Sequence, residues 1–260
     1  MIPFPNINPT AFSFFGIDIQ WYGIAYAMGF FLGLMYAKKI LSNKKIIDPK
    51  IFEDVILWLA LGVIIGGRLG YVFFYNFEYY FQNPGEILKL WQGGMSFHGG
   101  LLGVIISTII YSNKTKTSFF EFADIISCAA PIGIFLGRIA NFINGELYGK
   151  ISTLPWAIIF PNAGNLARHP SQIYEAILEG IFLFLLINYF ALKKKLILKT
   201  GFTSGVFLIL YSFFRIVSEI FREPDMHLGL FFNYFSLGTL LSIITLICGF
   251  IIILYRKKNE

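Results

Sequence analysis

The sequence has 260 residues, of which 56% are hydrophobic, 18% are aromatic and only 14% are charged. With a mean hydropathy of +0.67, the chain carries more apolar surface than a soluble core of this length could bury. This excludes a soluble globular protein and indicates an integral membrane protein. The net charge of +6 does not indicate nucleic-acid binding, because most basic residues lie in short clusters between or after apolar runs, as cytoplasmic loops of membrane proteins do.

Seven apolar runs are candidates for transmembrane helices, since about 20 helical residues cross about 30 Å of hydrocarbon. They lie at 19–38, 52–75, 97–112, 122–143, 172–192, 202–221 and 231–255. The third run is the shortest, because Asn113 follows it before a full span is complete. When every basic cluster is placed in the cytoplasm, the N-terminus lies outside and the C-terminus lies inside. The predicted fold class is therefore an all-α polytopic membrane protein with about seven transmembrane helices.

The whole chain, 1–260, is expected to form a single integral membrane domain. Two segments then face outward: 76–96, whose aromatic residues suit the membrane interface, and 144–171, which is rich in Pro, Gly and Asn. No charged n-region with a small-residue cleavage site marks the N-terminus, so we expect no removable signal peptide. Cys128 and Cys248 lie inside apolar runs, which is typical of structural cysteines rather than of a disulfide or a nucleophile.

Three arginines stand at a similar depth in the predicted spans. At about 1.5 Å per helical residue, Arg138, Arg215 and Arg68 lie roughly 7 to 10 Å below the outer helix ends. A charge near the middle of a span costs about 2.5 to 3.5 kcal/mol and is retained where it meets a partner or a substrate. Because the guanidinium fork also suits phosphate, this pattern favours an anion site. The alternatives are neutralisation inside the protein and snorkelling to the interface.

Few acidic residues could pair with these arginines at that depth. The candidates are Glu146, Glu175, Glu219 and Asp18. In the sixth run, polar residues recur at spacings of 4, 4 and 3 and so lie on one stripe of a helix. They are Tyr211, Arg215, Glu219 and Arg222. The stripe is either a structural salt-bridge ladder or an arrangement in which Glu219 holds Arg215 for a ligand.

Histidines and tyrosines at the outer ends of the runs are candidates for proton transfer. His98 lies between glycines in GGMSFHGGLLG, 93–103. Glycine lets a ligand approach closely and histidine accepts a proton near neutral pH, although an interfacial histidine is often only hydrogen bonded. Tyr22, in WYG, is by default an aromatic-belt residue. His169, in RHPSQ, marks the start of a helix with proline in its first turn, and His227 lies in a turn.

Several catalytic patterns do not occur in the sequence. It contains no GxSxG elbow, no HExxH, no paired cysteines with metal-ligand spacing and no cluster of intramembrane aspartates. Metal-free chemistry on a phospholipid of the outer leaflet is the interpretation that remains. A transporter is a rival, but its site usually lies near the membrane midplane, whereas these polar residues lie toward the outer side. A structural or lipid-binding membrane protein is the second rival.

The segment 137–149 reads GRIANFINGELYG. It resembles the signature of the bacterial prolipoprotein diacylglyceryl transferases, which is roughly G-R-x-[GA]-N-F-x-N-x-E-x-x-G, and it meets every fixed position. Five other segments resemble that family's blocks in the same order: WYG (21–23), GGRLGYVFFYN (66–76), GGMSFHGGLLG (93–103), RHPSQIYE (168–175) and FRIVSEIFREPD (214–225). The resemblance covers nearly the whole chain.

The resemblance implies transfer of the diacylglyceryl group of phosphatidylglycerol to the thiol of the lipobox cysteine in a preprolipoprotein, with release of glycerol 1-phosphate. This is the first step of bacterial lipoprotein maturation. The implied enzyme is metal-independent, needs no cofactor and spans the inner (cytoplasmic) membrane with its active site facing the periplasm. Its partners are then phosphatidylglycerol, preprolipoprotein signal peptides with a lipobox cysteine and the lipid bilayer, with no nucleic acid.

The resemblance also implies roles for individual residues. Substrate binding falls to Arg138, Asn141, Glu146 and Gly149. Catalytic roles fall to His98, Arg215, Glu219, Tyr22 and Tyr211. The base that deprotonates the thiol stays open between His98, Tyr22 and the field of the arginines, and so does the participation of Arg68 and His169. Two departures, Gln20 before WYG and a short outward segment between Lys150 and Arg168, affect the surroundings of the substrate rather than the core chemistry.

Overall fold

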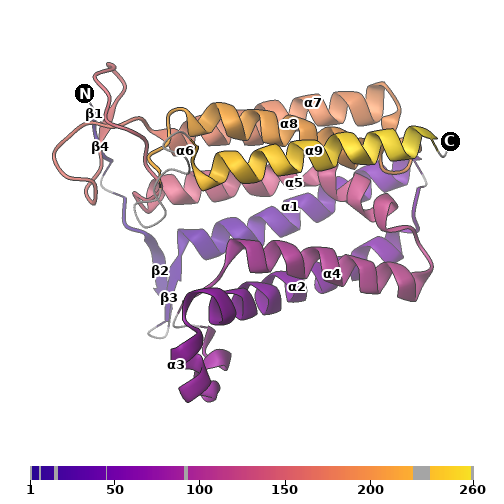
Figure 1. Ribbon diagram of the computed structural model, residues 1–260, viewed down its shortest axis with the longest axis horizontal. Helices are drawn as coiled ribbons and strands as arrows, with labels where there is room; N and C mark the ends of the chain where they lie inside the picture. Colours follow the sequence, from indigo (N-terminus) through magenta and orange to yellow (C-terminus); the bar gives the residue numbers. More distant parts are fainter. Residues whose placement is uncertain are drawn as a thin grey trace. The chain divides into compact units, whose positions relative to one another are not determined.

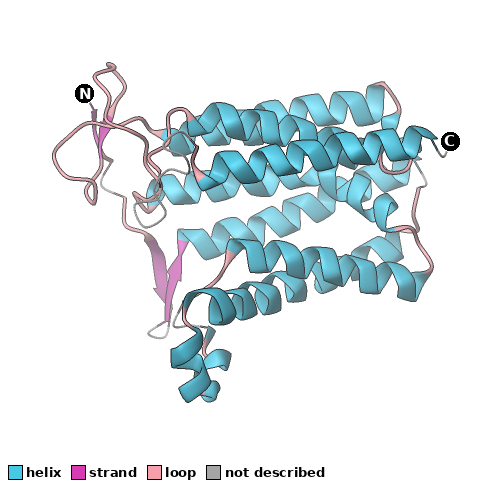
Figure 2. Cartoon of the chain, viewed as in Figure 1, coloured by secondary structure: helices cyan, strands magenta, loops and turns pink. Residues whose placement is uncertain are grey.

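The computed structural model describes residues 2–5, 7–14, 17–44, 46–90, 93–224 and 235–258. The chain divides into two compact units, of which unit 1 comprises Met1–Ala37 and Ala123–Glu260 and unit 2 comprises Lys38–Phe122. Figure 2 shows that both units consist mainly of helix. The strands are short and lie in the N-terminal segment and in the loop before residue 171.

Six helices among the described residues are long and apolar enough to cross a membrane. They are α1 (Trp21–Lys44), α2 (Pro49–Tyr75), α5 (Phe119–Ile143), the helix Ser171–Lys193, α8 (Phe202–Glu219) and α9 (Leu237–Lys258). The helix Ser171–Lys193 runs through α6 (Ser171–Glu175), the π-helix η3 (Ala176–Phe182), α7 (Leu183–Asn188) and the π-helix η4 (Tyr189–Lys193). An all-α polytopic membrane protein is confirmed.

The third predicted run, 97–112, is also helical. It forms α4 (Phe97–Thr115), which is not among the six helices that qualify as spans. Its passage through a membrane therefore stays a prediction, as does the orientation of the chain.

In unit 1 the helices run alternately between two ends (Figure 1). The ends of α5 and α8 and the starts of α1, α6 and α9 lie at one end, and the long loop 144–171 lies there too. The opposite end carries basic residues that follow η4 and close α9. This separation of basic clusters from loop 144–171 is the one expected for alternating spans.

Buried polar contacts fix the helices of unit 1 against one another. The carboxylate of Asp124 on α5 accepts hydrogen bonds from the backbone amides of Gly201, at 2.6 Å, and Ser204, at 2.7 Å. Gly201 is the N-cap residue of α8 and Ser204 lies in its first turn. N–H groups at a helix start have no partner within the helix, so Asp124 caps α8 from a neighbouring helix. On the other side of α8, Gly249 of α9 packs so closely that an added Cβ would lie 2.9 Å from the Gly205 carbonyl oxygen.

The two cysteines are both free, with Cys128 buried and Cys248 exposed. The backbone carbonyl of Cys128 accepts a hydrogen bond from the amide of Asn188 at 3.1 Å, and the hydroxyl of Tyr36 donates to the Asn188 side-chain oxygen at 2.8 Å. Cys128 therefore lies in the packed interior between α5 and α7. The expectation of a small core residue is therefore confirmed for Cys128 and is wrong for Cys248, which is exposed on α9.

Unit 2 is built on close packing of α2 against α4. Glycines spaced four residues apart on α2 meet glycines of α4, and a Cβ on Gly70 would lie 2.7 Å from the Cα of Gly99, while one on Gly66 would lie 2.8 Å from the Cα of Gly103. Side chains larger than hydrogen would separate the helices. Beyond α2 lie the short helix α3 (Phe77–Gln82) and the 3-10 helix η1 (Pro84–Leu88).

Arg68 has a role that the sequence did not predict. Its side chain is buried, and its guanidinium donates to the carbonyl oxygens of Glu86 at 2.7 Å, Ile87 at 2.8 Å and Gly93 at 2.5 Å, with further contacts to Gly94 and Lys89. It also lies over the ring of Tyr80, 5.1 Å from the centroid. Arg68 thus binds the backbone of segment 76–96 and uses its donors there, instead of meeting an acidic side chain or reaching the interface.

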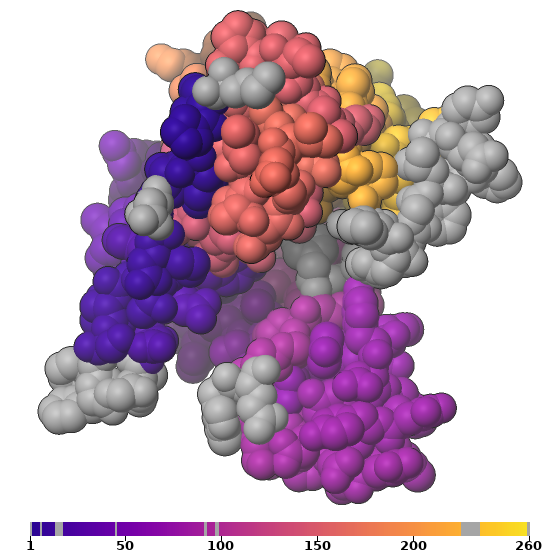
Figure 3. All heavy atoms as spheres, turned by 90° about the vertical axis from the view of Figure 1, so that its left-hand side faces the viewer, coloured from indigo at the N-terminus to yellow at the C-terminus, as the bar shows by residue number. Residues whose placement is uncertain are grey.

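The remaining strands belong to unit 1. β1 (Ile2–Pro3) pairs in parallel with β4 (Ile158–Ile159), and β2 (Thr10–Phe14) forms an antiparallel hairpin with β3 (Ile17–Gln20). The segment 144–171 therefore has a defined path, since its backbone also pairs Gly149 with Arg222 and Arg168 with both Ile151 and Ile158. Figure 3 shows this segment in salmon beside the indigo N-terminal segment.

Candidate active site

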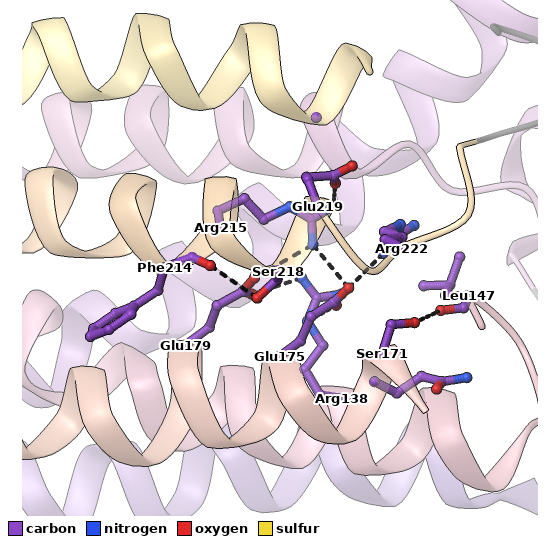
Figure 4. A network of polar contacts seen from close by, with 12 residues as sticks. Arg138, Leu147, Ser171, Glu175, Glu179, Phe214, Arg215, Ser218, Glu219 and Arg222 are labelled. Atoms are coloured by element: carbon purple, nitrogen blue, oxygen red, sulfur yellow. Dashed lines mark hydrogen bonds and ion pairs between the residues drawn. The ribbon is translucent and has the colours of Figure 1, made fainter. Parts of the chain in front are cut away.

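Six charged side chains of unit 1 meet in one network (Figure 4). They come from α5, from the helix Ser171–Lys193 and from α8 with the turn that follows it. We call them the arginine–glutamate network: Arg138, Glu175, Glu179, Arg215, Glu219 and Arg222. Its three arginines and three glutamates have formal charges that cancel.

Two fully buried carboxylates form the centre of the network. Glu175 and Glu179 have side chains that are 0% exposed. Glu175 lies 2.9 Å from Arg138 Nε and 3.2 Å from Arg215 Nη1. Glu179 lies 3.0 Å from Arg138 Nη2 and 3.5 Å from Arg215 Nη1. Each carboxylate therefore contacts both arginines, which holds the two guanidinium groups next to each other.

The outer members of the network extend it along α8. Arg215 Nη2 pairs with Glu219 one helical turn later, and Arg222 Nη1 lies 3.2 Å from Glu175 Oε1. The charged residues of the stripe predicted on this helix thus form ion pairs, both with each other and with Glu175 of α6. Tyr211, on the same stripe, lies close enough to Arg138, Arg215 and Glu179 to interact with them electrostatically.

The arginines are more exposed than their carboxylate partners. The side chains of Arg138 and Arg215 are 18% and 13% exposed, whereas those of Glu175 and Glu179 are completely covered. Buried ion pairs need such mutual contacts, because an unpaired charge in an apolar interior is costly. Each of these two arginine side chains thus pairs with carboxylates that are more deeply buried than the arginine itself.

Glu179 is the member of this network that was not predicted from the sequence. It lies in the π-helix η3, in a run that was interpreted as an apolar span. A second carboxylate four residues after Glu175 lies on the same helical face, and that spacing could have revealed it. π-Helical turns inside α-helices are frequent at functional sites, and this one carries a residue that contacts two helices at once.

Two of the acidic residues expected to be partners of the arginines lie elsewhere, which corrects that expectation. Glu146 Oε1 accepts a hydrogen bond from the amide of Asn141 at 2.8 Å. Asp18 accepts one from the hydroxyl of Ser13 at 2.5 Å in the N-terminal hairpin. Neither makes an ion pair with Arg138 or Arg215 among the contacts of the described residues. The partners there are Glu175, Glu179 and Glu219.

The second half of segment 137–149 is a turn held by its own polar side chains. Besides the Asn141–Glu146 contact, Gln172 Nε2 donates to the backbone carbonyl of Glu146 at 2.5 Å, and the Ser171 hydroxyl donates to that of Leu147 at 2.9 Å. The start of α6 therefore fixes the turn directly after α5. Tyr22 lies close enough to both Glu146 and Arg138 to interact with them electrostatically, so these predicted residues share one region.

Gly149 lies where two backbones approach closely. Its N–H donates to the carbonyl of His169 at 2.9 Å, and a Cβ at this position would lie 2.5 Å from the Phe221 carbonyl oxygen and 2.6 Å from His169 Cβ. Any side chain would push these parts of the loop apart. The requirement for glycine here is thus explained by packing between residue 149 and the chain after α8.

His169 is part of a small aromatic cluster next to the network. Its Nδ1 lies 3.2 Å from the hydroxyl of Tyr174, which also accepts a hydrogen bond from the indole of Trp156 at 2.8 Å. Its ring packs edge-on against Phe221 at 5.3 Å. Burial lowers the pKa of His169 below its usual value, and the nearby ammonium of Lys150 lowers the pKa further. The neutral imidazole is therefore favoured.

Two predicted histidines cannot be placed in the site. His98 belongs to the first turn of α4, which is capped by the Ser96 hydroxyl accepting from Gly99 N at 3.2 Å, but its side chain lies outside the described residues. His227 also lies outside them. Among the described residues, no three His, Cys, Asp or Glu side chains are grouped as metal ligands.

Comparison with known proteins assigns the family. Residues 9–255 match the family model described as prolipoprotein diacylglyceryl transferase. The chain belongs to this family. The resemblance carried by segment 137–149 is thereby confirmed, and the protein is a transferase.

Individual relatives of this transferase cover almost its full length. It is 51% identical over 247 residues to a phosphatidylglycerol–prolipoprotein diacylglyceryl transferase of Rickettsia canadensis, covering 95% of each chain. The protein of the same name from Rickettsia felis is 49% identical over 247 residues, again with 95% of each chain, and that from Rickettsia bellii is 46% identical over 252 residues, with 96% of each.

Proposed function

We propose that the protein transfers the diacylglyceryl group of phosphatidylglycerol to the thiol of the lipobox cysteine of preprolipoproteins, releasing glycerol 1-phosphate. Membership of the family and the names of its relatives support this reaction. The observation that carries it is the pairing of Arg138 and Arg215. Their side chains are 18% and 13% exposed, and their guanidinium groups lie next to each other against two buried carboxylates, which is an arrangement suited to a phosphate ester.

The reaction is a displacement at an sp³ carbon. A thiolate attacks C3 of the glyceryl group, a C–S bond forms and the C–O bond to the phosphate breaks, with its electron pair going to the phosphate oxygen. Negative charge on the leaving group rises in the transition state. Preorganised donors aimed at such charge are typically worth about 3 to 4 kcal/mol each. Arg138 and Arg215 are proposed to supply these donors from two directions.

The buried carboxylates give the arginines their orientation before substrate arrives. A free arginine side chain has many rotamers, and ordering it costs conformational entropy. Glu175 and Glu179 hold both guanidinium groups in place, so this cost is met during folding rather than in the transition state. Glu219 holds Arg215 from a third side, and Tyr211 lies beside the same groups.

The thiol must lose its proton, since the thiolate is the nucleophile and free cysteine has a pKa near 8.5. His98 is the proposed base, with Tyr22 and the field of the arginines as alternatives. Tyr22 is supported by its proximity to Arg138 and Glu146. Asn141 and Glu146, joined by a hydrogen bond, are proposed to shape the glycerol site, with Gly149 allowing the close packing behind them. Neither a metal nor another cofactor is assigned a step.

The enzyme is proposed to span the bacterial inner membrane as one domain over 1–260, with the N-terminus and the active site on the periplasmic side. In unit 1 Arg138 lies near the end of α5, Glu175 ends α6 and Glu219 ends α8. The arginine–glutamate network therefore lies toward the end that carries loop 144–171, away from the basic residues that close α9. Basic clusters stay in the cytoplasm, so this arrangement supports a periplasmic site. Segment 76–96, with exposed Phe77, Phe81 and Leu88, suits the outer lipid interface.

The test is product analysis with purified protein in lipid vesicles. Phosphatidylglycerol with a labelled glycerol headgroup and a second label in its acyl chains is mixed with a peptide that contains a lipobox cysteine. We expect the acyl label on the peptide and the headgroup label in free glycerol 1-phosphate, with no product when cysteine is replaced by serine. Lipid movement without a thioether would favour a transporter, and binding without either would favour a structural or lipid-binding protein.

A further inference from the structure

We propose that the first turn of α9 positions Glu219, and through it Arg215, by means of the Ser236 hydroxyl and the absence of a side chain at Gly238. This inference rests on the proposed role of Arg215 at the phosphate. It assigns a catalytic task to a helix that contributes none of the arginine–glutamate network. Ser236 and Gly238 are positioning residues, because they act on the reaction only through Glu219 and Arg215.

The two oxygens of Glu219 have different partners. Oε1 pairs with Arg215 Nη2, while Oε2 accepts a hydrogen bond from the Ser236 hydroxyl at 2.8 Å. The Glu219 side chain is only 6% exposed, so contact with water cannot replace a lost partner easily. In Figure 4, Glu219 lies beneath the N-terminal end of α9, on the side of Arg215 away from Glu175 and Glu179.

The orientation of the Ser236 hydroxyl is fixed from both sides. Its oxygen accepts from the backbone amide of Thr239 at 3.1 Å, and the Ser236 backbone carbonyl accepts from Leu240 at 3.2 Å, as expected for a residue that caps a helix start. A hydroxyl has one proton, and a carboxylate can only accept. In the contact with Glu219 the Ser236 hydroxyl is therefore the donor, while its oxygen accepts from the Thr239 amide and lies 3.0 Å from the Thr239 hydroxyl, which can donate to it.

Gly238 leaves the space that the Glu219 carboxylate occupies. A Cβ at this position would lie 2.8 Å from Glu219 Cδ and 3.3 Å from Arg215 Nη2. The atoms in its way belong to the end of a flexible side chain, so a methyl group would displace the carboxylate rather than the backbone. Gly238→Ala is therefore a change that moves Glu219 relative to Arg215 while leaving the helix intact.

Other contacts also attach α9 to α8. Further along the helices, the Ser212 hydroxyl contacts Thr245 Oγ1 at 2.6 Å, and Gly205 faces Gly249. A matched control lies between the two regions. Ser242 is buried, and its hydroxyl donates to the Gly238 carbonyl at 2.7 Å, within its own helix. Ser242→Ala thus removes a buried hydroxyl from α9 without touching Glu219.

The test compares kcat and KM for phosphatidylglycerol in vesicles. A hydrogen bond to a charged group is worth enough for its loss to lower a rate roughly tenfold. We expect Ser236→Ala and Gly238→Ala to lower kcat about tenfold, with KM changed less than about twofold, because Arg215 meets charge that develops in the transition state. Ser236→Thr keeps the hydroxyl and should retain the activity of the parent protein. Ser242→Ala should match the parent protein in kcat and in melting temperature.

A double-mutant cycle separates positioning from a general effect on folding. If Ser236 acts through Glu219, Ser236→Ala should change kcat less than about twofold in a Glu219→Ala background, where no side-chain oxygen at position 219 remains to accept from Ser236. An undiminished effect there, or equal losses for Ser242→Ala, would overturn the inference. If Arg215→Ala is inactive but both α9 variants are fully active, the positioning role fails and the proposed function stands. If Arg215→Ala is fully active, both the proposed role of Arg215 and the positioning role of the α9 residues fail.

Discussion

Arg138 and Arg215 are held by opposite oxygens of the same two carboxylates. Arg138 contacts Oε2 of Glu175 and Oε2 of Glu179, at 2.9 and 3.0 Å, whereas Arg215 contacts Oε1 of each, at 3.2 and 3.5 Å. The two positive side chains come from α5 and α8 and would repel each other if the carboxylates between them were removed. Their proximity, which the proposed phosphate binding requires, is thus produced by a third helix.

Arg138→Lys tests the need for a planar fork. Lysine keeps the charge but cannot contact Glu175 and Glu179 through two separate nitrogen atoms of one rigid group. We expect transfer from phosphatidylglycerol to fall about 100-fold or more, the scale of losing one oriented donor. The measurement is the initial rate of thioether formation in vesicles. Cys128→Ala is the control, since the reacting thiol belongs to the peptide, and a near-normal rate for Arg138→Lys would remove the fork from the mechanism.

Glu179→Gln tests the carboxylate that was not predicted from the sequence. The change keeps the size of the side chain but leaves Arg138 and Arg215 with one fewer buried partner. Removing one member of a buried ion pair typically costs about 3 to 5 kcal/mol, so both the melting temperature in detergent and the transfer rate should fall. Glu223→Gln is matched to it, because Glu223 pairs with Arg168 but is 39% exposed and should change little. Equal effects of the two variants would contradict a central role for Glu179.

Gly149→Ala tests whether the glycine is required by packing. An added methyl group would meet the Phe221 carbonyl oxygen and the Cβ of His169, and such overpacking costs about 1 to 3 kcal/mol. We expect a lower melting temperature together with lower activity. Gly137→Ala is the matched control in the same segment, because a Cβ added at Gly137 would have no heavy atom within 4 Å outside its own stretch of helix. Lost activity at an unchanged melting temperature would instead indicate direct contact with substrate.

Arg68→Lys tests the contacts between Arg68 and the backbone of segment 76–96. A lysine ammonium has three donors around one point and cannot reach the carbonyls of Glu86, Ile87 and Gly93 together. We expect faster cleavage in this segment by a protease added to protein in detergent. Lys89→Gln, which removes the ion pair of a more exposed side chain, should change cleavage less. If Arg68→Lys loses transfer activity while protease cleavage is unaltered, Arg68 is again a candidate for anion binding.

Because the pKa of His169 is lowered in the folded protein, we expect the folded protein to lose stability in acid. Its pKa in the folded protein lies below the usual value because of burial and Lys150, while in the unfolded chain it takes up a proton near pH 6.5. As the pH falls below about 6.5, the unfolded state binds more protons than the folded state, so the folded state loses stability. The melting temperature of His169→Gln should therefore fall less between about pH 7.5 and 5.5 than that of the parent. Parallel curves would contradict this.

The helices could be predicted from the length of the apolar runs, because a segment in lipid must satisfy its backbone hydrogen bonds internally and has few alternatives to a helix. The boundaries shifted modestly: the first helix runs over Trp21–Lys44 rather than 19–38, because lysines at its end can follow the apolar part without leaving the helix. The approach of Arg138 to Arg215 was also predictable, since both were placed at one depth with a need for counter-charges.

Contacts that depend on backbone geometry could not be predicted. Nothing in the side-chain pattern indicates that Arg68 would donate to carbonyl oxygens of a later segment, because every residue carries a carbonyl. The close approach of Gly149 to Phe221 is likewise a property of the folded loop. Glu179 is a different case: its charge was visible in the sequence, but hydropathy averaged over a whole span hides a single carboxylate.

The cancelling charges of the arginine–glutamate network have a consequence for turnover. A site that displayed bare guanidinium groups would grip any phosphate tightly and would also retain the product. In the proposed mechanism, the bound ester would compete with Glu175 and Glu179, which already pair with the same arginines. Ground-state affinity would then stay moderate, and an increase in negative charge would shift the balance toward the ligand. After glycerol 1-phosphate leaves, the two carboxylates would pair with the guanidinium groups again, and the site would be free for the next lipid.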